Sequence, residues 1–207
     1  MPIRLVLFDC DGVLFDSEPA NLAFYRDVLR CCGAPPVPES AEAAYHALAS
    51  AELFGSLFPG DRALAERLLR TARETDYGPY FALMQPKPLL RETLALLKQS
   101  YKTGMATNRG TTTHRVVEVF GLQGLFDVAV GVLDVVKPKP APDMLTLCLD
   151  RLGVAAQEAV YVGDQPTDLQ AANAAGFHFV GMGPMCGQTP HSAQRFEDIP
   201  ALVASLV

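Results

Sequence analysis

The sequence of 207 residues lacks the features that mark a membrane-spanning or exported protein. No apolar run approaches the roughly eighteen residues that a bilayer-spanning helix needs. The amino terminus enters an apolar run almost at once, and no basic segment, apolar core and cleavage site of a secretory signal precede it. We therefore expect a cytoplasmic protein that contacts no membrane.

Cysteine patterns typical of metal or disulfide frameworks are also missing. The five cysteines are an odd set with no C-x-x-C pair and no zinc-like spacing: Cys10, Cys31, Cys32, Cys148 and Cys186. Free cysteine behaves as a small hydrophobic residue in most protein interiors. We expect reduced and mostly buried thiols, without a zinc site.

Positive charge is scarce, with 17 Lys and Arg against 23 Asp and Glu and a net charge of −6. A broad nucleic-acid-binding surface needs clustered positive charge, so this balance argues against one. The four histidines are scattered, and neither a G-x-S-x-G elbow nor a G-x-x-x-x-G-K-[ST] loop occurs. Serine-hydrolase and P-loop chemistry are therefore not indicated.

What the chain does have is the pattern of an α/β protein. The apolar run 3–8 is typical of a strand that is covered on both faces. After Pro86-Lys87-Pro88, expected helices at 89–99, 112–120, 142–152 and up to 175 alternate with expected strands at 101–106, 128–132, 159–162 and 177–180. This alternation predicts a Rossmann-like, doubly wound parallel sheet.

A helical stretch interrupts this pattern after the first strand. Helical spacing of apolar residues predicts helices at 18–33, 40–54 and 61–75, and no convincing strand appears between residues 17 and 86. The sequence therefore predicts an α/β core domain at 1–16 and 87–207 and an inserted all-α domain at 17–86.

Polar residues follow the expected strands of the core domain. They form four groups: Asp9 with Asp11, Thr107 with Asn108, Lys137 with Lys139, and Asp164 with Asp168. The carboxyl ends of parallel strands meet at one edge of a sheet, where such folds bind their ligands. We expect a binding site at this edge.

Acids gathered in this way favour a hard cation and phosphate chemistry. Two carboxylates 4 Å apart repel each other by about 4 kcal/mol at an effective dielectric constant of about 20. Oxygen ligands select Mg²⁺ or a similar ion, while lysine, hydroxyl and backbone N–H groups suit phosphate oxygens. With an ordinary pKa of about 3.9, Asp9 is expected to be ionised and available as a nucleophile, whereas Asp11 would need a raised pKa to act as an acid.

The four groups also resemble, in order, the motifs of haloacid dehalogenase superfamily phosphatases. The resemblance is to the branch of phosphoglycolate phosphatase and β-phosphoglucomutase, which carries a helical cap after the first motif. The motif D-x-D-G-V/T-L-x-D-S matches residues 9–17, the second motif matches 107–108, K-P-x-P-D matches 139–143 and G-D-x-x-x-D matches 163–168. The match spans the whole chain and identifies the insertion as the cap.

The resemblance implies a Mg²⁺ site and a covalent phosphoryl-transfer mechanism. Asp9 would be the nucleophile and a metal ligand, and Asp11 the acid and base that also gives the metal its backbone carbonyl. Asp164 would bind the metal, and Asp168 would help to hold either the metal or the lysine. The substrate would be a small phosphoester.

The remaining motif residues are candidates for phosphate binding. The resemblance implies that Thr107 and Asn108 bind phosphate, and Arg109, which follows them, is a further candidate for substrate binding. Two lysines compete for the third motif. Lys139 is assigned as the charge-stabilising residue because the pattern K-P-x-P-D at 139–143 ends in the required acid. The pattern that starts at Lys137 lacks this acid.

The expected function is a Mg²⁺-dependent phosphatase that acts through an aspartyl phosphate. A phosphomutase of the same fold is one alternative, although Asn21 stands where that branch usually carries His. A dehalogenase is less consistent with Asp11, because those relatives generally lack an acid there. A non-catalytic binding protein on the same scaffold is the alternative from another class, and the presence of both Asp9 and Asp11 argues against it.

Overall fold

The computed structural model describes residues 2–35, 37, 45 and 48–206 of the chain. These residues divide into two compact units, one that runs to Asp16 and resumes at Pro86, and one that spans Ser17–Gln85. The expected insertion was 17–86, so Pro86 falls on the other side of the division.

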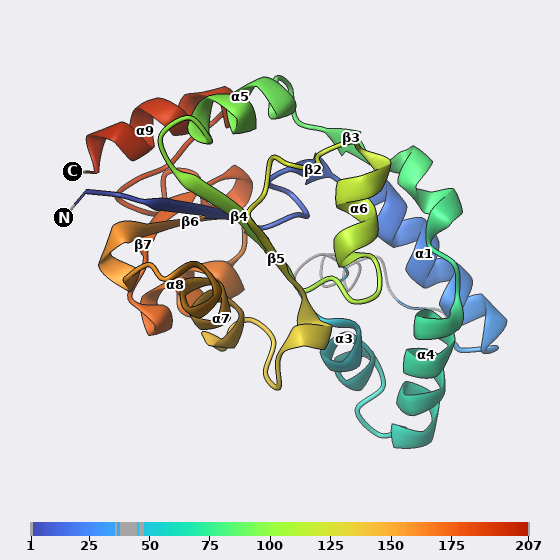
Figure 1. The fold of residues 1–207 in the computed structure, drawn as a ribbon. Helices are drawn as coiled ribbons and strands as arrows, with labels where there is room; N and C mark the ends of the chain where they lie inside the picture. The colour runs from blue at the N-terminus through green and yellow to red at the C-terminus, as the bar shows by residue number, and fades with distance from the viewer. Residues whose placement is uncertain (1, 36, 38–44, 46–47, 207) are drawn as a thin grey trace. The chain divides into compact units, whose positions relative to one another are not determined.

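A five-stranded parallel sheet forms the centre of the first unit (Figure 1). Its strands are β1 (Leu5–Phe8), β4 (Lys102–Ala106), β5 (Val128–Val130), β6 (Ala159–Gly163) and β7 (His178–Gly181). The strand order is β5-β4-β1-β6-β7. Every residue of β1 and β6 is buried, as strands covered on both faces require. The predicted Rossmann-like α/β fold is confirmed.

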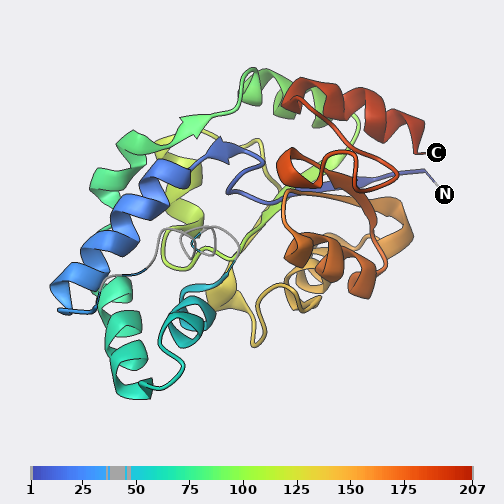
Figure 2. The same cartoon turned by 180° about the vertical axis from the view of Figure 1, so that it is seen from behind.

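Helices cover both faces of this sheet. They are α5 (Leu90–Leu97), α6 (Thr113–Val119), α7 (Asp143–Leu152), α8 (Pro166–Ala175) and α9 (Ile199–Ser205). Helices α7 and α8 pack together on one face, while α5 and α9 pack together on the other, as the front and back views show (Figures 1 and 2). Helices α7 and α8 end at Gly153 and Gly176, whose left-handed backbone stops a helix.

The strand register aligns the ends that carry the polar groups. Phe8 lies opposite Met105 of β4 and Val162 of β6, so that the residues after β1, β4 and β6 emerge at the same level. Gly104 permits the close approach of the neighbouring strand, because a side chain there would meet Val128 and Leu7 at less than 3 Å. The sheet therefore brings three distant segments to one edge.

The second unit is helical and has an aromatic core. It contains α1 (Glu18–Cys31), α3 (Ser50–Leu57), α4 (Arg62–Glu74) and a 3-10 turn at Gly78–Leu83. Rings that contact one another come from α1, α3 and the turn region: Phe24, Tyr25, Phe54, Tyr77, Tyr80 and Phe81.

Among the described helices of the chain, none is both long and apolar enough to cross a bilayer.

The structure differs from the expected elements in three places. The helix expected at 40–54 falls largely outside the described residues, and α3 extends beyond it to Leu57. A strand does occur between residues 17 and 86, because Gln85–Pro86 (β3) pairs with Phe15–Asp16 (β2). Helix α9 was not predicted. Strands of two residues are too short for a periodic signal.

Candidate active site

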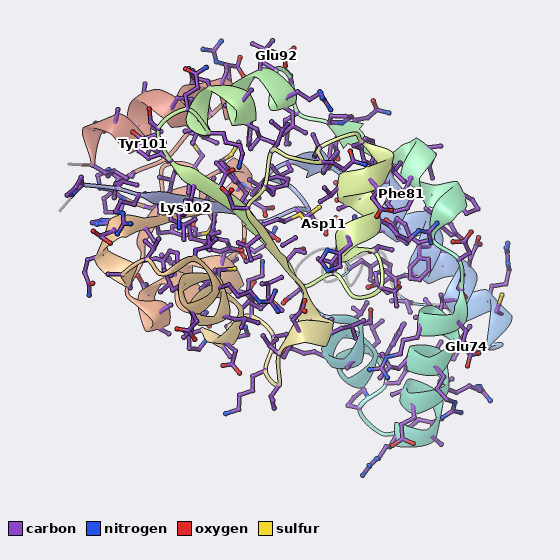
Figure 3. All side chains as sticks on the ribbon, in the orientation of Figure 1. Asp11, Glu74, Phe81, Glu92, Tyr101 and Lys102 are labelled. Atoms are coloured by element: carbon purple, nitrogen blue, oxygen red, sulfur yellow. The ribbon has the colours of Figure 1, made fainter. Side chains whose placement is uncertain are left out.

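The candidate residues lie beyond the carboxyl ends of the strands of the first unit. Asp9 directly follows β1, Thr107 follows β4, and Asp164 follows β6. Figure 3 shows Asp11 at one end of β4 and Tyr101 and Lys102 at the opposite end, where that strand begins. The sheet thus places the polar segments where open α/β sheets bind ligands.

Lys139 is the cation at the centre of this group. Its side chain is 2% exposed, and its Nζ lies 2.9 Å from Oδ1 of Asp9 and 2.7 Å from Oδ1 of Asp168. It also donates a hydrogen bond of 2.8 Å to the hydroxyl of Tyr161. Burial acts to lower the pKa of Lys139, but the two carboxylates outweigh it and raise that pKa. Lys139 therefore stays charged, whereas Lys137 is exposed and lies outside the group.

Asp168 holds Lys139 and the start of helix α8 at the same time. Its Oδ1 accepts from Lys139 and lies 3.2 Å from the hydroxyl of Tyr161, which donates its one proton to the closer carbonyl of Ala106. Its Oδ2 accepts from the backbone N–H groups of Asp164 and Gln165, at 3.1 and 3.0 Å. Because both oxygens already accept hydrogen bonds from the protein, the geometry favours the lysine over the metal as the partner of Asp168.

The carboxyl of Asp9 is strongly perturbed. Its Oδ1 accepts from the backbone N–H of Cys10 at 2.7 Å in addition to its contact with Lys139. Burial raises the pKa of Asp9 from 3.8 to about 8, and neighbouring acids, Asp168 foremost, add to the rise against the opposing effect of Lys139. Burial therefore opposes the ionised form of Asp9 that its ordinary pKa led us to expect, whereas the contact with Lys139 favours that form.

Asp164 provides the clearest sign of a cation site. It is 5% exposed, and burial, supported by Asp168, raises its pKa from 3.8 to about 7. Its Oδ1 is buried and has no hydrogen-bond partner among the described residues. Ligand oxygens of Asp9, Asp164 and Asp168 lie within 4.8 Å of one another. An acidic cluster that can hold a divalent metal is therefore present, and its all-oxygen donors suit a hard cation.

The side chain of Asp11 lies apart from this cluster and pairs with Arg109. Nη2 and Nε of Arg109 donate to the two oxygens of Asp11 at 2.6 and 2.9 Å, in a bidentate pair. The side chain of Asp11 is 11% exposed and that of Arg109 is 5% exposed. A third donor of the guanidinium, Nη1, lies 3.3 Å from the hydroxyl of Thr112. The fork of Arg109 is thus directed at the candidate acid and base.

Thr107 and Asn108 have different surroundings although they are adjacent. Thr107 is fully buried, and its hydroxyl accepts from the backbone N–H of Arg109 at 3.3 Å. The side-chain amide of Asn108 accepts from the backbone N–H of Lys139 at 3.1 Å and donates to its carbonyl at 3.2 Å. Asn108 therefore anchors the loop that carries the lysine.

Comparison with known proteins identifies the family of the chain. The family model of haloacid dehalogenase-like hydrolases matches residues 6–182. The chain belongs to this family. A phosphoglycolate phosphatase of Shigella boydii is 31% identical over 87% of the chain and 81% of that protein. The pyrophosphatase PpaX of Halalkalibacterium halodurans is 28% identical over 85% of the chain and 81% of that protein.

Solved structures of the family have the same fold. A subfamily IA hydrolase of Geobacter sulfurreducens is 33% identical with a TM-score of 0.73, over 97% of the chain and 96% of that structure. A haloacid dehalogenase-like hydrolase of Streptococcus pneumoniae reaches a TM-score of 0.83 at 18% identity, over 96% and 97% of the two chains. The recognition from the motifs is confirmed, and the chain is a phosphatase of this family, that is, a phosphoric monoester hydrolase.

Of two further residues of this haloacid dehalogenase-like hydrolase, Tyr161 was missed by sequence reasoning and Gln165 was given no role. Tyr161 lies within the apolar strand β6, and its hydroxyl contacts Lys139 and donates to the carbonyl of Ala106 at 2.8 Å. Gln165 follows Asp164 and donates to it at 2.8 Å. A tyrosine in an apolar run carries no signal of its own. The Gln was noticed only because relatives often have Ser there.

Proposed function

We propose that the chain is a Mg²⁺-dependent phosphatase that hydrolyses a small phosphorylated metabolite through a phosphorylated Asp9. The observation that carries the proposal is the contact of 2.9 Å between Asp9 and the buried Lys139, in a cluster that includes Asp164. A carboxylate held beside a permanent positive charge suits attack on phosphorus, because the cation offsets the repulsion between the negative carboxylate and the negative phosphate.

Asp9 and Asp164 are proposed to hold the metal, and the backbone carbonyl of Asp11 is a further ligand that the family resemblance implies. The orphaned, buried oxygen of Asp164 supports this assignment, because such an oxygen is costly without a partner. When bound, Mg²⁺ would lower the pKa of the surrounding carboxyls and offset the charge of the phosphate. Asp168 is proposed to position Lys139 instead of binding the ion.

The proposed reaction has two steps on the residues of this chain. A carboxylate oxygen of Asp9 attacks phosphorus and the bond from phosphorus to the leaving oxygen breaks. Asp11 gives that oxygen a proton, which requires Asp11 to be protonated at this stage and one of its two contacts with Arg109 to open. Water then attacks the phosphorylated Asp9, Asp11 takes back a proton, and phosphate leaves. Lys139 is proposed to stabilise the phosphoryl oxygens, and Thr107 to bind them.

Arg109 is proposed to orient Asp11 for this proton transfer. Its bidentate hydrogen bonds at 2.6 and 2.9 Å hold both carboxylate oxygens. A planar fork restricts the carboxylate more than a single point charge would. This proposal replaces the earlier expectation of direct substrate binding by Arg109, and a competing role in substrate binding would appear in KM.

The substrate class is proposed from the relatives. Several curated relatives are named phosphoglycolate phosphatases, which supports a small phosphoester of the phosphoglycolate or sugar phosphate class. The helical unit at Ser17–Gln85 is proposed to be the cap domain of the family and to contribute to substrate selection.

The test is phosphate release from a panel of phosphometabolites with Mg²⁺, by the unaltered chain and by Asp9→Asn. The proposal expects turnover of at least one small phosphoester and its loss in the variant, because the amide is a poor nucleophile. Undiminished turnover by Asp9→Asn would contradict the covalent mechanism. Interconversion of hexose phosphates without net phosphate release would instead identify a phosphomutase.

A further inference from the structure

The side chain of Gln165 contacts one oxygen of the candidate metal ligand Asp164. Its Nε2 lies 2.8 Å from Oδ2. The two ends of a glutamine amide are distinguished by their partners, and an ionised carboxylate can only accept. The NH₂ end of Gln165 must therefore face Asp164, so that the contact is a hydrogen bond donated by the amide.

Gln165 is itself held in place by its backbone. It is the residue that precedes α8, and its backbone N–H donates to Oδ2 of Asp168 at 3.0 Å. That carboxylate also accepts from the backbone N–H of Asp164 at 3.1 Å. The same buried acid thus fixes the main chain of both residues, which leaves the Gln165 side chain as the group that orients the Asp164 carboxylate.

Gly12 encloses the same oxygen from another side. A Cβ at this position would lie 2.1 Å from Oδ2 of Asp164, and its backbone has a φ of +78°, which favours glycine. The same Cβ would lie 2.8 Å from Oδ1, so the main chain at Gly12 lies against the whole carboxylate and most closely against Oδ2, which the amide of Gln165 also contacts. The second oxygen, Oδ1, is buried without a hydrogen-bond partner among the described residues.

We infer that Gln165 is a positioning residue of the metal site. Its amide holds Oδ2 of Asp164 so that Oδ1 of the same carboxylate faces the cation. The inference rests on the proposed function and extends it to Gln165, which occupies an unspecified position of the motif G-D-x-x-x-D at 163–168. Partners that orient metal ligands in this way typically change metal affinity about 10- to 100-fold when they are removed.

The decisive variant is Gln165→Met, which keeps the length of the side chain and removes the donor. Binding of Mn²⁺ and Mg²⁺ to the intact chain is measured by calorimetry at about pH 8, where Asp164, with a pKa of about 7, is largely ionised. We expect the dissociation constant to rise about 10- to 100-fold. Gln165→Ser, which is too short to reach Oδ2, should have the same effect and serves as the second variant if the first does not fold.

The matched control is Gln157→Met, the same change at an exposed position of the same unit, which should leave the dissociation constant unchanged. Equal affinity in the unaltered chain and a folded Gln165→Met would overturn the inference while leaving the proposed function intact. An equal loss in Gln157→Met would overturn it as well. Failure of the unaltered chain to bind either ion would instead contradict the metal dependence of the proposed function.

Discussion

Replacement of Asp164 by Asn should stabilise the protein in the absence of metal and abolish its stabilisation by Mg²⁺. Burial raises the pKa of Asp164 from 3.8 to about 7. At about 1.4 kcal/mol per pKa unit, carrying this charge costs the folded chain up to about 4 kcal/mol. Asn removes the charge, and Gln165 can turn its amide so that its oxygen accepts from the new NH₂ group.

The gain should depend on pH in a defined direction. An acid with a raised pKa stabilises the folded chain fully below its unfolded value of 3.8, and this contribution is lost as the pH rises toward about 7. The advantage of Asp164→Asn should therefore be about 1 kcal/mol at about pH 4.5 and about 2–4 kcal/mol at about pH 8, the lower figure allowing for an imperfectly paired amide.

Urea unfolding followed by circular dichroism, with EDTA at both pH values, measures this difference. Mg²⁺ at about 100 times its dissociation constant should add about 2.7 kcal/mol to the unaltered chain and nothing to the variant. The control is Asp150→Asn, which removes an exposed charge from α7 and should change stability by less than about 0.5 kcal/mol. A variant less stable than the unaltered chain at the higher pH would refute the reasoning.

Two further substitutions test how the candidate site is held together. Tyr161→Phe removes the hydroxyl that accepts from Lys139 at 2.8 Å and donates to Ala106. We expect the free energy of unfolding in urea to fall by about 1–3 kcal/mol, and kcat to fall about tenfold with KM little changed. An unchanged kcat would show that the hydroxyl does not position Lys139. Arg109→Lys cannot reproduce the bidentate pair with Asp11, so steady-state kinetics should show a lower kcat at similar KM, whereas a higher KM at unchanged kcat would identify Arg109 as a substrate-binding residue.

The position of the candidate site was predictable because it depends on strand ends alone. Asp9 and Asp164 each follow an apolar run, and parallel strands in register bring such ends together whatever the distance between them in the sequence. The choice of Lys139 over Lys137 came from the motif, and only Lys139 lies within the buried group.

The electrostatics of the candidate site could not be predicted from the sequence. The pKa of Asp9 rises to about 8 because its carboxyl is buried among other acids, and burial is a property of the folded chain. The pairing of Asp11 with Arg109 joins residues 98 positions apart, with no local pattern to indicate it. Likewise, no spacing rule reveals that both oxygens of Asp168 accept hydrogen bonds from the protein.

The charges of the cluster account for the kind of ion that it should accept. Asp9, Asp164 and Asp168 bring three carboxylates together around the one ammonium of Lys139, which leaves two negative charges when all are ionised. The pKa values of Asp9 and Asp164 are raised to about 8 and about 7, so these two carboxyls would take up protons where no cation offsets them. A divalent cation matches this excess and can replace both protons, whereas a monovalent ion would leave one charge buried and uncompensated. Asp11 adds to the negative charge near Asp9 and Asp164 and raises the pKa of both, and its own charge is paired with Arg109 at 2.6 Å.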